Sequence, residues 1–258
     1  MLLLTTVSSE GEVVTHSFAS DQDAALARYF DHIWTCVEAG AGPGRSPFTL
    51  VQAATTGRDG APQLRTVVLR QAHRAQNAVW FHADARSPKV AELHADPRIS
   101  LLAYDPQSQL QIRMAGHATI SDDEAERRRM WTTSRAHTLV LYQSPLTPST
   151  SVASPEEAYP SDSSHVTADT NASDMHPEVK TTHDEATDGK AKIAAKTTAK
   201  APTDTDVTPA ITDPGYAHFS LIRVVIQRFD ALHITSEGHK RALFTRDKST
   251  WKASWLVP

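Results

Sequence analysis

A long segment that cannot form a hydrophobic core divides this chain in two. Residues 147–214 consist largely of Ser, Thr, Asp, Ala, Pro and Lys, and they contain no Leu, Phe or Trp. Such a composition buries too little apolar surface to offset the entropy lost when a chain becomes ordered. We therefore predict a disordered, low-complexity insertion over residues 147–214, most simply a solvated tether. Residues 1–146 and 215–258 must then build one domain together, the second part completing the first.

Charge and cysteine content exclude several classes of protein. The formal net charge is -4 and the pI is about 6.3, which argues against a general binder of nucleic acid or of an anionic membrane. Cys36 is the single cysteine, so no internal disulfide can form, and we expect a reducing, cytoplasmic location. No stretch of the sequence is apolar enough for a membrane span.

Two helices are predicted around a series of strands. The first begins at a cap at Ser20 and ends at Gly40. Its apolar residues recur at helical spacing and are Leu26, Phe30, Ile33 and Val37. A second helix is expected from Asp122 towards Arg135.

Short β-branched segments at hairpin spacing make up the rest of the folded sequence. We expect strands over residues 48–55, 64–70, 78–83, 99–104, 110–120, 219–225, 229–234, 242–245 and 251–256. Many short strands with few helices favour an antiparallel barrel over a parallel doubly wound sheet. The predicted fold class is therefore mainly β, a β-barrel with flanking helices.

One stretch holds the side chains best suited to bind a phosphate. Ser87 is a good N-cap and Pro88 suits a first helical turn, so free N–H groups, the Ser87 hydroxyl and Lys89 could hold an anion. A capped surface helix with an incidental lysine is the alternative from this motif alone. Arg65 and Arg70 of the preceding strand lie on opposite faces of an ideal strand unless a bulge intervenes.

Other candidate motifs lack the structural context that their function requires. The glycines between Gly40 and Gly44 follow a helix rather than a strand, so they do not form a dinucleotide-binding loop. The 13 histidines show no metal-ligand spacing, and no metal site is predicted. Cys36 is expected to be a small packing residue of the first helix.

Five segments in the same order and spacing resemble the successive FMN-binding motifs of the pyridoxamine 5′-phosphate oxidase family. They are residues 65–70, 80–89, 96–102, 111–116 and the C-terminal run from Arg241 through Trp251 to the final Trp255-Leu256-Val257-Pro258. The resemblance covers most of the chain outside the insertion. It implies an FMN-binding split β-barrel of the PNP oxidase-like kind, a homodimer with FMN (flavin mononucleotide) in each of two interface clefts.

The resemblance also implies roles for single residues. Those implied to contact FMN are Arg65, Thr66, Val67, Val68, Arg70, His82, Ala83, Ser87, Lys89, Gln111 and Arg241. Among them, Arg65, Lys89 and Ser87 would hold the phosphate. Arg135 and His239 would bind substrate, and no catalytic residue is assigned.

Three departures from the family pattern bear on the substrate. Pro88 replaces an arginine that helps to hold phosphate, a loss for which Arg86 could compensate. Glu237 replaces the arginine of a substrate-binding Arg-x-His motif whose histidine remains as His239, and Trp131 stands at a tyrosine position. A carboxylate at residue 237 would repel a phosphorylated substrate. Flavin binding is therefore better supported than pyridoxamine phosphate oxidation.

The resemblance favours an FMN-dependent oxidoreductase in which hydride passes between a small substrate and the flavin. Pyridoxamine or pyridoxine 5′-phosphate is the candidate substrate, with oxygen as acceptor. Two alternatives stay open: a flavin-binding carrier or sensor without turnover, and a split-barrel protein that uses haem or a deazaflavin. The expected partners are a small-molecule substrate and a second copy of the chain, with no nucleic acid and no membrane.

Overall fold

The computed structural model describes residues 2–7, 13–18, 21–158 and 212–258, and it describes side chains from residue 23 onward within these ranges. The chain begins with an antiparallel pair, β1 (Leu2–Val7) and β2 (Val13–Phe18), that is separate from the main sheet. This N-terminal pair was not predicted.

In the part of the chain that the structure describes, no helix has the length and apolarity needed to cross a membrane.

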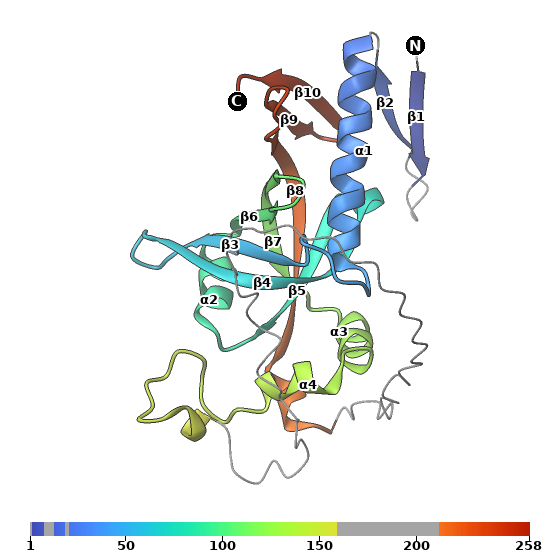
Figure 1. Ribbon diagram of the computed structural model, residues 1–258. Helices are drawn as coiled ribbons and strands as arrows, with labels where there is room; N and C mark the ends of the chain where they lie inside the picture. The colour runs from blue at the N-terminus through green and yellow to red at the C-terminus, as the bar shows by residue number, and fades with distance from the viewer. Residues whose placement is uncertain (1, 8–12, 19–20, 159–211) are drawn as a thin grey trace, which may run out of the picture.

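A closed antiparallel barrel forms the centre of the molecule (Figure 1). Its strands are β3 (Leu50–Thr56), β4 (Pro62–His73), β5 (Ala78–Asp84), β6 (Arg98–Asp105), β7 (Leu110–Ile120) and β8 (Phe219–His233). The order is β8-β5-β4-β3-β6-β7, and β7 pairs again with β8 to close the ring. The predicted mainly β barrel with flanking helices is confirmed, and β8 returns from beyond the insertion to complete it.

β8 is one long strand, although the sequence predicted two, over residues 219–225 and 229–234. The exposed pair Gln227 and Arg228 resembles a break between strands, but the chain stays extended there. The register shifts at this point, because the consecutive β7 residues Ala115 and Gly116 face Arg228 and Ile226, so Gln227 is the extra residue of a bulge in β8. A Cβ on Gly116 would lie 2.0 Å from the carbonyl oxygen of Val225, so only glycine lets the two backbones approach this closely.

Helix α1 (Asp21–Ala41) packs its predicted apolar face into the core of the barrel. Leu26, Phe30, Ile33 and Val37 are all buried, as predicted. α1 runs beside β9 (Lys240–Asp247) and β10 (Thr250–Leu256), which extend the sheet beyond β8 (Figure 1). The ring of Phe30 lies 4.9 Å from that of Phe244 and 5.0 Å from that of Trp251, so the helix and this hairpin share one aromatic core.

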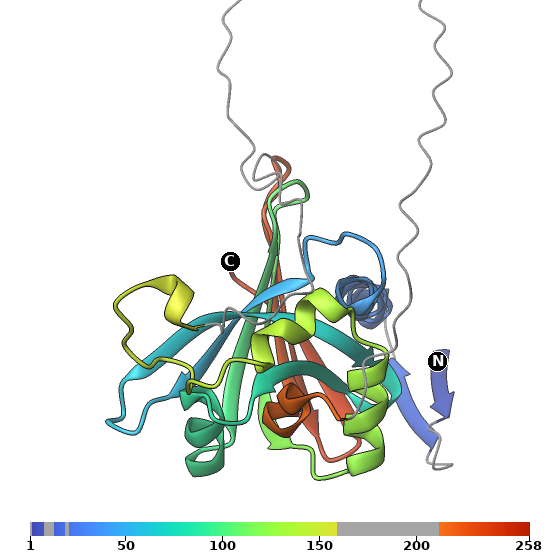
Figure 2. The ribbon, with the colours of Figure 1, turned by 90° about the horizontal axis from the view of Figure 1, so that it is seen from below.

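A second apolar cluster covers the outer face of β5 and β8. The second predicted helix, from Asp122 towards Arg135, is α3 (Glu124–Thr132), and a short helix that was not predicted, α4 (Ala136–Leu139), follows it. Trp131 is buried against Phe219 of β8, with ring centroids 5.3 Å apart. Seen from below, these yellow-green helices lie over the strands of the barrel (Figure 2).

Most of the predicted insertion, residues 159–211, lies outside the described residues, so its disorder and the domain boundaries stay predictions. Its two flanks are described, and they lie together. The side chain of Gln143 donates to Asp213 at 2.9 Å, and the hydroxyl of Ser144 donates to the carbonyl of Ala158 at 2.6 Å. The barrel therefore holds both ends of the segment.

Deletion of residues 159–211, closed by a short Gly-Ser linker, should leave the fold intact. The contacts of Gln143 with Asp213 and of Ser144 with Ala158 remain in this variant, and loop length changes the free energy of unfolding only slowly, by about 0.6 kcal/mol per doubling. Urea denaturation of both chains measures the difference. A loss of cooperative unfolding in the shortened chain would show that the segment is part of the fold.

Candidate functional site

The three predicted phosphate-binding side chains meet beside α2 (Pro88–Ala95), which packs against β3 and β7. The hydroxyl of Ser87 donates to the Asp84 carbonyl at 2.6 Å, and the ammonium of Lys89 donates to the Ser87 hydroxyl at 3.2 Å. Arg65 approaches from β4. Burial and the charge of Arg65 lower the pKa of Lys89, while the carboxylates of Asp84 and Glu92 act in the opposite direction.

Two residues of this cluster were not predicted. Nη2 of Arg65 donates to Oε2 of Glu92 at 2.7 Å, while its Nη1 donates to the hydroxyl of Thr55. That hydroxyl donates in turn to Oε2 of Glu92 at 2.5 Å. Glu92 is 6% exposed and shares the buried side of α2 with Val90 and Leu93. The sequence did contain a sign of the buried role of Glu92, because it is an acidic residue at a position of the helix where an apolar residue is expected.

Lys89 has no comparable partner. Among the described residues no carboxylate forms an ion pair with its ammonium, although the residue is largely removed from solvent. The nearby carboxylates of Asp84 and Glu92 offset only part of the cost of desolvating this ammonium, and an anion in direct contact would offset more of it. Asp84 is paired with Arg86, so the cluster is left with two positive charges, on Arg65 and Lys89, against the single negative charge of Glu92. Its donors and its net charge therefore fit a phosphate group.

Arg86, which was expected to compensate for the missing arginine at residue 88, has other hydrogen-bond partners in this structure. Its Nε and Nη2 donate to the two carboxylate oxygens of Asp84 at 3.0 and 2.8 Å. Nη2 also donates to the carbonyl of Ser144 at 3.0 Å. The guanidinium therefore holds the chain that follows α4, and whether it also contacts a phosphate stays a prediction.

A second site lies around Arg70. The register of β4 and β5 shifts between Leu69 and Gln71, so Arg70 is the extra residue of a bulge. It lines a cavity of about 580 Å³ between β4, β5, the chain after α1 and the α3–α4 connection, which we call the Arg70 pocket. Its polar lining residues are Thr49, Arg70, Gln71, His82, Thr133, Ser134, Arg135, His137 and Thr138. The bulge does not bring Arg70 to Arg65.

The Arg70 pocket is positively charged and poorly solvated. Burial lowers the pKa of Arg70, and the charge of Arg135 acts in the same direction. Burial also lowers the pKa of His82 to about 3, helped by the charge of Arg70, so this imidazole is neutral at physiological pH. None of the described residues that line the pocket is acidic. Such a pocket favours a small anion.

The other predicted flavin contacts on β4 and β5 lie on two different faces of the sheet. The side chains of Val67 and Ala83 are buried in the core, at 6% and 3% exposure, so only their main chain could contact a ligand. Val68 lines the Arg70 pocket. Thr66 is exposed on the outer face of β4, where Leu64 also lies.

Gln111 and Arg241 lie on that outer sheet face, away from the Arg65 cluster of the same chain. Gln111 lines a cavity of about 520 Å³ together with Leu64 and Asp230. Asp230 is buried and accepts from Nε and Nη2 of Arg241, both at 2.9 Å. Its hydrogen bond to Arg241 is the main cause of its lowered pKa.

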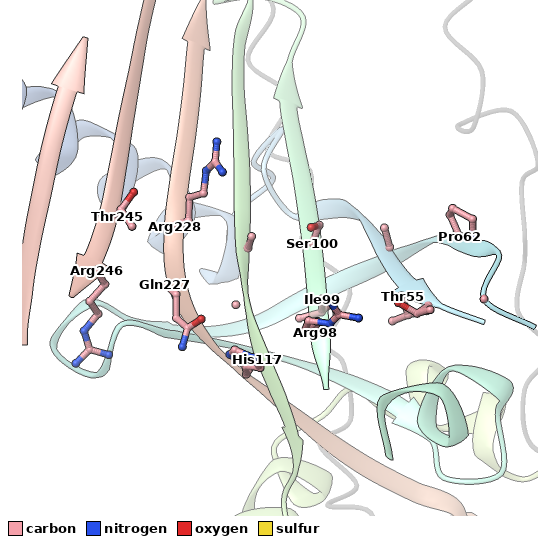
Figure 3. A pocket seen from close by; sticks show the side chains of 15 residues that line it. Thr55, Pro62, Arg98, Ile99, Ser100, His117, Gln227, Arg228, Thr245 and Arg246 are labelled. Atoms are coloured by element: carbon pink, nitrogen blue, oxygen red, sulfur yellow. The ribbon is translucent and has the colours of Figure 1, made fainter. Parts of the chain in front are cut away.

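The outer sheet face continues into an adjacent cavity of about 630 Å³ (Figure 3). Four cationic or titratable side chains line it from neighbouring strands: Arg98 of β6, His117 of β7, Arg228 of β8 and Arg246 of β9. The sequence analysis did not single out these residues. Their common signal is a basic residue at outward-facing positions of successive strands.

The two predicted substrate-binding residues are not brought together within one chain. Arg135 lines the Arg70 pocket. His239 is exposed beside the turn between β8 and β9, where the hydroxyl of Thr235 donates to the carbonyl of Gly238.

Within the described ranges no group of three or more His, Cys, Asp and Glu side chains could hold a metal ion.

Comparison with known proteins identifies the fold. Residues 31–122 match the family described as pyridoxamine 5′-phosphate oxidase, FMN-binding domain. No curated protein sequence matches this chain significantly. The resemblance to the pyridoxamine 5′-phosphate oxidase family is therefore confirmed, and it is carried by the segment that contains the Arg65 cluster.

Solved structures show the same split β-barrel. A pyridoxamine 5′-phosphate oxidase-related, FMN binding protein from Nostoc punctiforme is 20% identical, with a TM-score of 0.56, and the match covers 94% of this chain and 100% of that one. PhzG from Burkholderia lata, solved with tetrahydrophenazine-1-carboxylic acid, is 17% identical, with a TM-score of 0.54, and the match covers 93% of this chain and 94% of that one. At these identities the likeness establishes the fold alone.

Asp230→Asn should reduce stability at neutral pH by about 2 kcal/mol, because three arginines then lose a buried carboxylate partner. The folded-state pKa of Asp230 lies below its ordinary value of 3.8. Its contribution is therefore present above that value and is lost as the pH falls through the depressed pKa. Urea denaturation at pH 7 and at pH 3 should show the two chains converging at the lower pH. An equal difference at both pH values would exclude this ion pair as the cause.

Proposed function

We propose that this chain, whose residues 31–122 match the FMN-binding domain of the pyridoxamine 5′-phosphate oxidase family, is an FMN-dependent oxidoreductase. The observation that carries the proposal is the desolvated ammonium of Lys89, which has no ion pair among the described residues and lies beside Ser87 and Arg65. FMN offers the doubly charged phosphate that this cluster lacks. When bound, the flavin supplies the two-electron chemistry.

Residues of α2 and of β4 would bind the phosphate jointly. Lys89 supplies an ammonium that forms no ion pair with a described carboxylate, and the Ser87 hydroxyl accepts a hydrogen bond from it. Arg65 supplies the second charge, and Glu92 and Thr55 fix its guanidinium from behind. Charge-assisted hydrogen bonds of this kind contribute about 1.5–3 kcal/mol each.

A homodimer is part of the same proposal. Gln111 and Arg241 would contact the flavin, but they lie on the outer sheet face rather than at the Arg65 cluster. The same face exposes Leu50, Leu64 and Tyr104, at 56%, 70% and 43%. Exposed apolar side chains on a continuous sheet face favour burial by another protein surface. A second copy would cover these side chains and bring its own Gln111 and Arg241 towards the cofactor.

The substrate that fits best is a small organic anion. The Arg70 pocket combines two arginines with hydroxyl groups, and none of its described lining residues is acidic. Pyridoxamine or pyridoxine 5′-phosphate, with oxygen as acceptor, meets that requirement. A carboxylic acid meets it as well, and the PhzG structure contains one.

A cytoplasmic location, expected from the single Cys36, belongs to the same proposal.

The first test is the visible spectrum of the purified full-length chain, followed by mass spectrometry of the small molecule released on denaturation. The expected result is flavin absorbance, and a released mass equal to that of FMN. A chain that shows no flavin absorbance and does not bind added FMN would refute the proposal. A haem or a deazaflavin in the released fraction would favour the alternatives.

Lys89→Met should weaken FMN binding by about 10- to 100-fold, since a charged donor to the phosphate is lost. Binding of riboflavin, which has no phosphate, should change less than about twofold on the same grounds. Lys252→Met is the matched control, because Lys252 lies on β10 and pairs with Asp247. Fluorescence titration measures both ligands. Equal losses for FMN and riboflavin would show that Lys89 does not contact the phosphate.

A further inference from the structure

Four buried polar atoms of residues that line the Arg70 pocket have no hydrogen-bond partner among the described residues. They are Oγ1 of Thr49, Nε of Arg70 and both ring nitrogens of His82. Arg70 and His82 come from the neighbouring strands β4 and β5, and both line the same cavity. Buried polar atoms of folded proteins are rarely left unsatisfied, so a cluster of four beside one cavity requires an explanation.

Packing does not explain why residue 82 is a histidine. Its ring packs edge-on against Phe219, with centroids 4.7 Å apart, in the manner of an aromatic hydrocarbon. A phenyl ring could make that contact without leaving two polar atoms unsatisfied. The histidine therefore costs stability in the unliganded protein. Such a cost is typical of a residue kept for binding rather than for folding.

The charge state of His82 determines what it can bind. The imidazole is neutral, because burial and the neighbouring Arg70 disfavour its protonated form. A neutral imidazole offers one N–H donor and one nitrogen acceptor. It therefore complements an uncharged polar group, such as a hydroxyl, whereas Arg70 and Arg135 complement an anionic group.

We propose that His82 is a specificity-determining residue that hydrogen-bonds a hydroxyl or similar neutral polar group of the substrate, next to the acidic group bound by Arg70 and Arg135. The substrate class is then a small hydroxylated organic acid or phosphate ester, rather than any small anion. This assignment moves His82 from the flavin contacts that the family resemblance implied to the substrate side of the site. It rests on the substrate pocket of the proposed function, and it does not require that the cofactor be FMN.

The first experiment compares two probes, benzoate and 3-hydroxybenzoate, by isothermal titration calorimetry of the full-length chain as purified. We expect the hydroxylated acid to bind roughly tenfold more tightly, as one additional hydrogen bond allows. In His82→Phe this ratio should fall below about twofold, while benzoate keeps its affinity. Arg70→Met should weaken both acids alike. An unchanged ratio in His82→Phe, or no binding of either acid to the natural chain, overturns the proposal.

The second experiment measures thermal unfolding of the same variants without any added acid. His82→Phe should raise Tm by a few degrees, because two unsatisfied polar atoms leave the interior. His94→Phe, at an exposed position of α2, is the control and should change Tm little. A Tm lowered by several degrees in His82→Phe would show that the histidine serves the fold, and it would refute the assignment. Neither readout depends on a flavin spectrum, so failure here is distinguishable from failure to bind FMN.

Discussion

The pairing of β8 with both β5 and β7 is the interaction on which the rest of the structure depends. β8 comes from beyond the insertion, yet its residues 219–225 pair with β5 and its residues 222–233 pair with β7. Without it β5 and β7 would each present an unpaired edge. Asn77, just before β5, strengthens the closure: its carbonyl accepts from the N–H of Ile226, and its side chain accepts from the indole N–H of Trp251. Both candidate sites are built on strands that this closure fixes.

The distribution of charge separates arginines that hold the structure together from cations that are available to a ligand. Arg86 is bound to Asp84 and Arg241 to Asp230, each by two short hydrogen bonds. These pairs satisfy their carboxylates. Lys89 and Arg70 differ, because each is partly desolvated and neither forms an ion pair within the described residues. Ligand binding is expected where a buried charged side chain has no ion-pair partner, rather than where basic residues are most numerous.

Local periodicity predicted much of the fold. The helical spacing of Leu26, Phe30, Ile33 and Val37 identified the buried face of α1, and the predicted bounds of residues 110–120 coincide with β7. These features depend on neighbours in sequence, which a single chain displays. The meeting of Arg65, Ser87 and Lys89 was also predicted, although from a family resemblance rather than from periodicity.

What the sequence did not reveal depends on contacts between distant segments. β8 remains one strand because it accommodates a bulge at Gln227, and the position of Arg70 depends on a bulge against β5. The pairing of Glu92 with Arg65 depends on how α2 packs onto the barrel. A one-residue register shift reverses which face a side chain occupies, and no local pattern specifies where such a shift falls. Arg65 and Arg70 were predicted to contact different parts of one FMN, and the structure places Arg65 beside Glu92 and Arg70 in the Arg70 pocket.

This separation bears on how such a protein acquires its specificity. The Arg65 cluster lies wholly within residues 31–122, the part that matches the FMN-binding domain of the family. The wall of the Arg70 pocket formed by residues 133–138 lies beyond that match, on the α3–α4 connection, which the aromatic cluster around Trp131 fixes. Substitutions in this wall can change the shape and charge of the substrate pocket without disturbing Lys89 or Ser87. In the proposed function, the two sites share β4, but the wall formed by residues 133–138 could change substrate choice without changing the residues that would hold the cofactor phosphate.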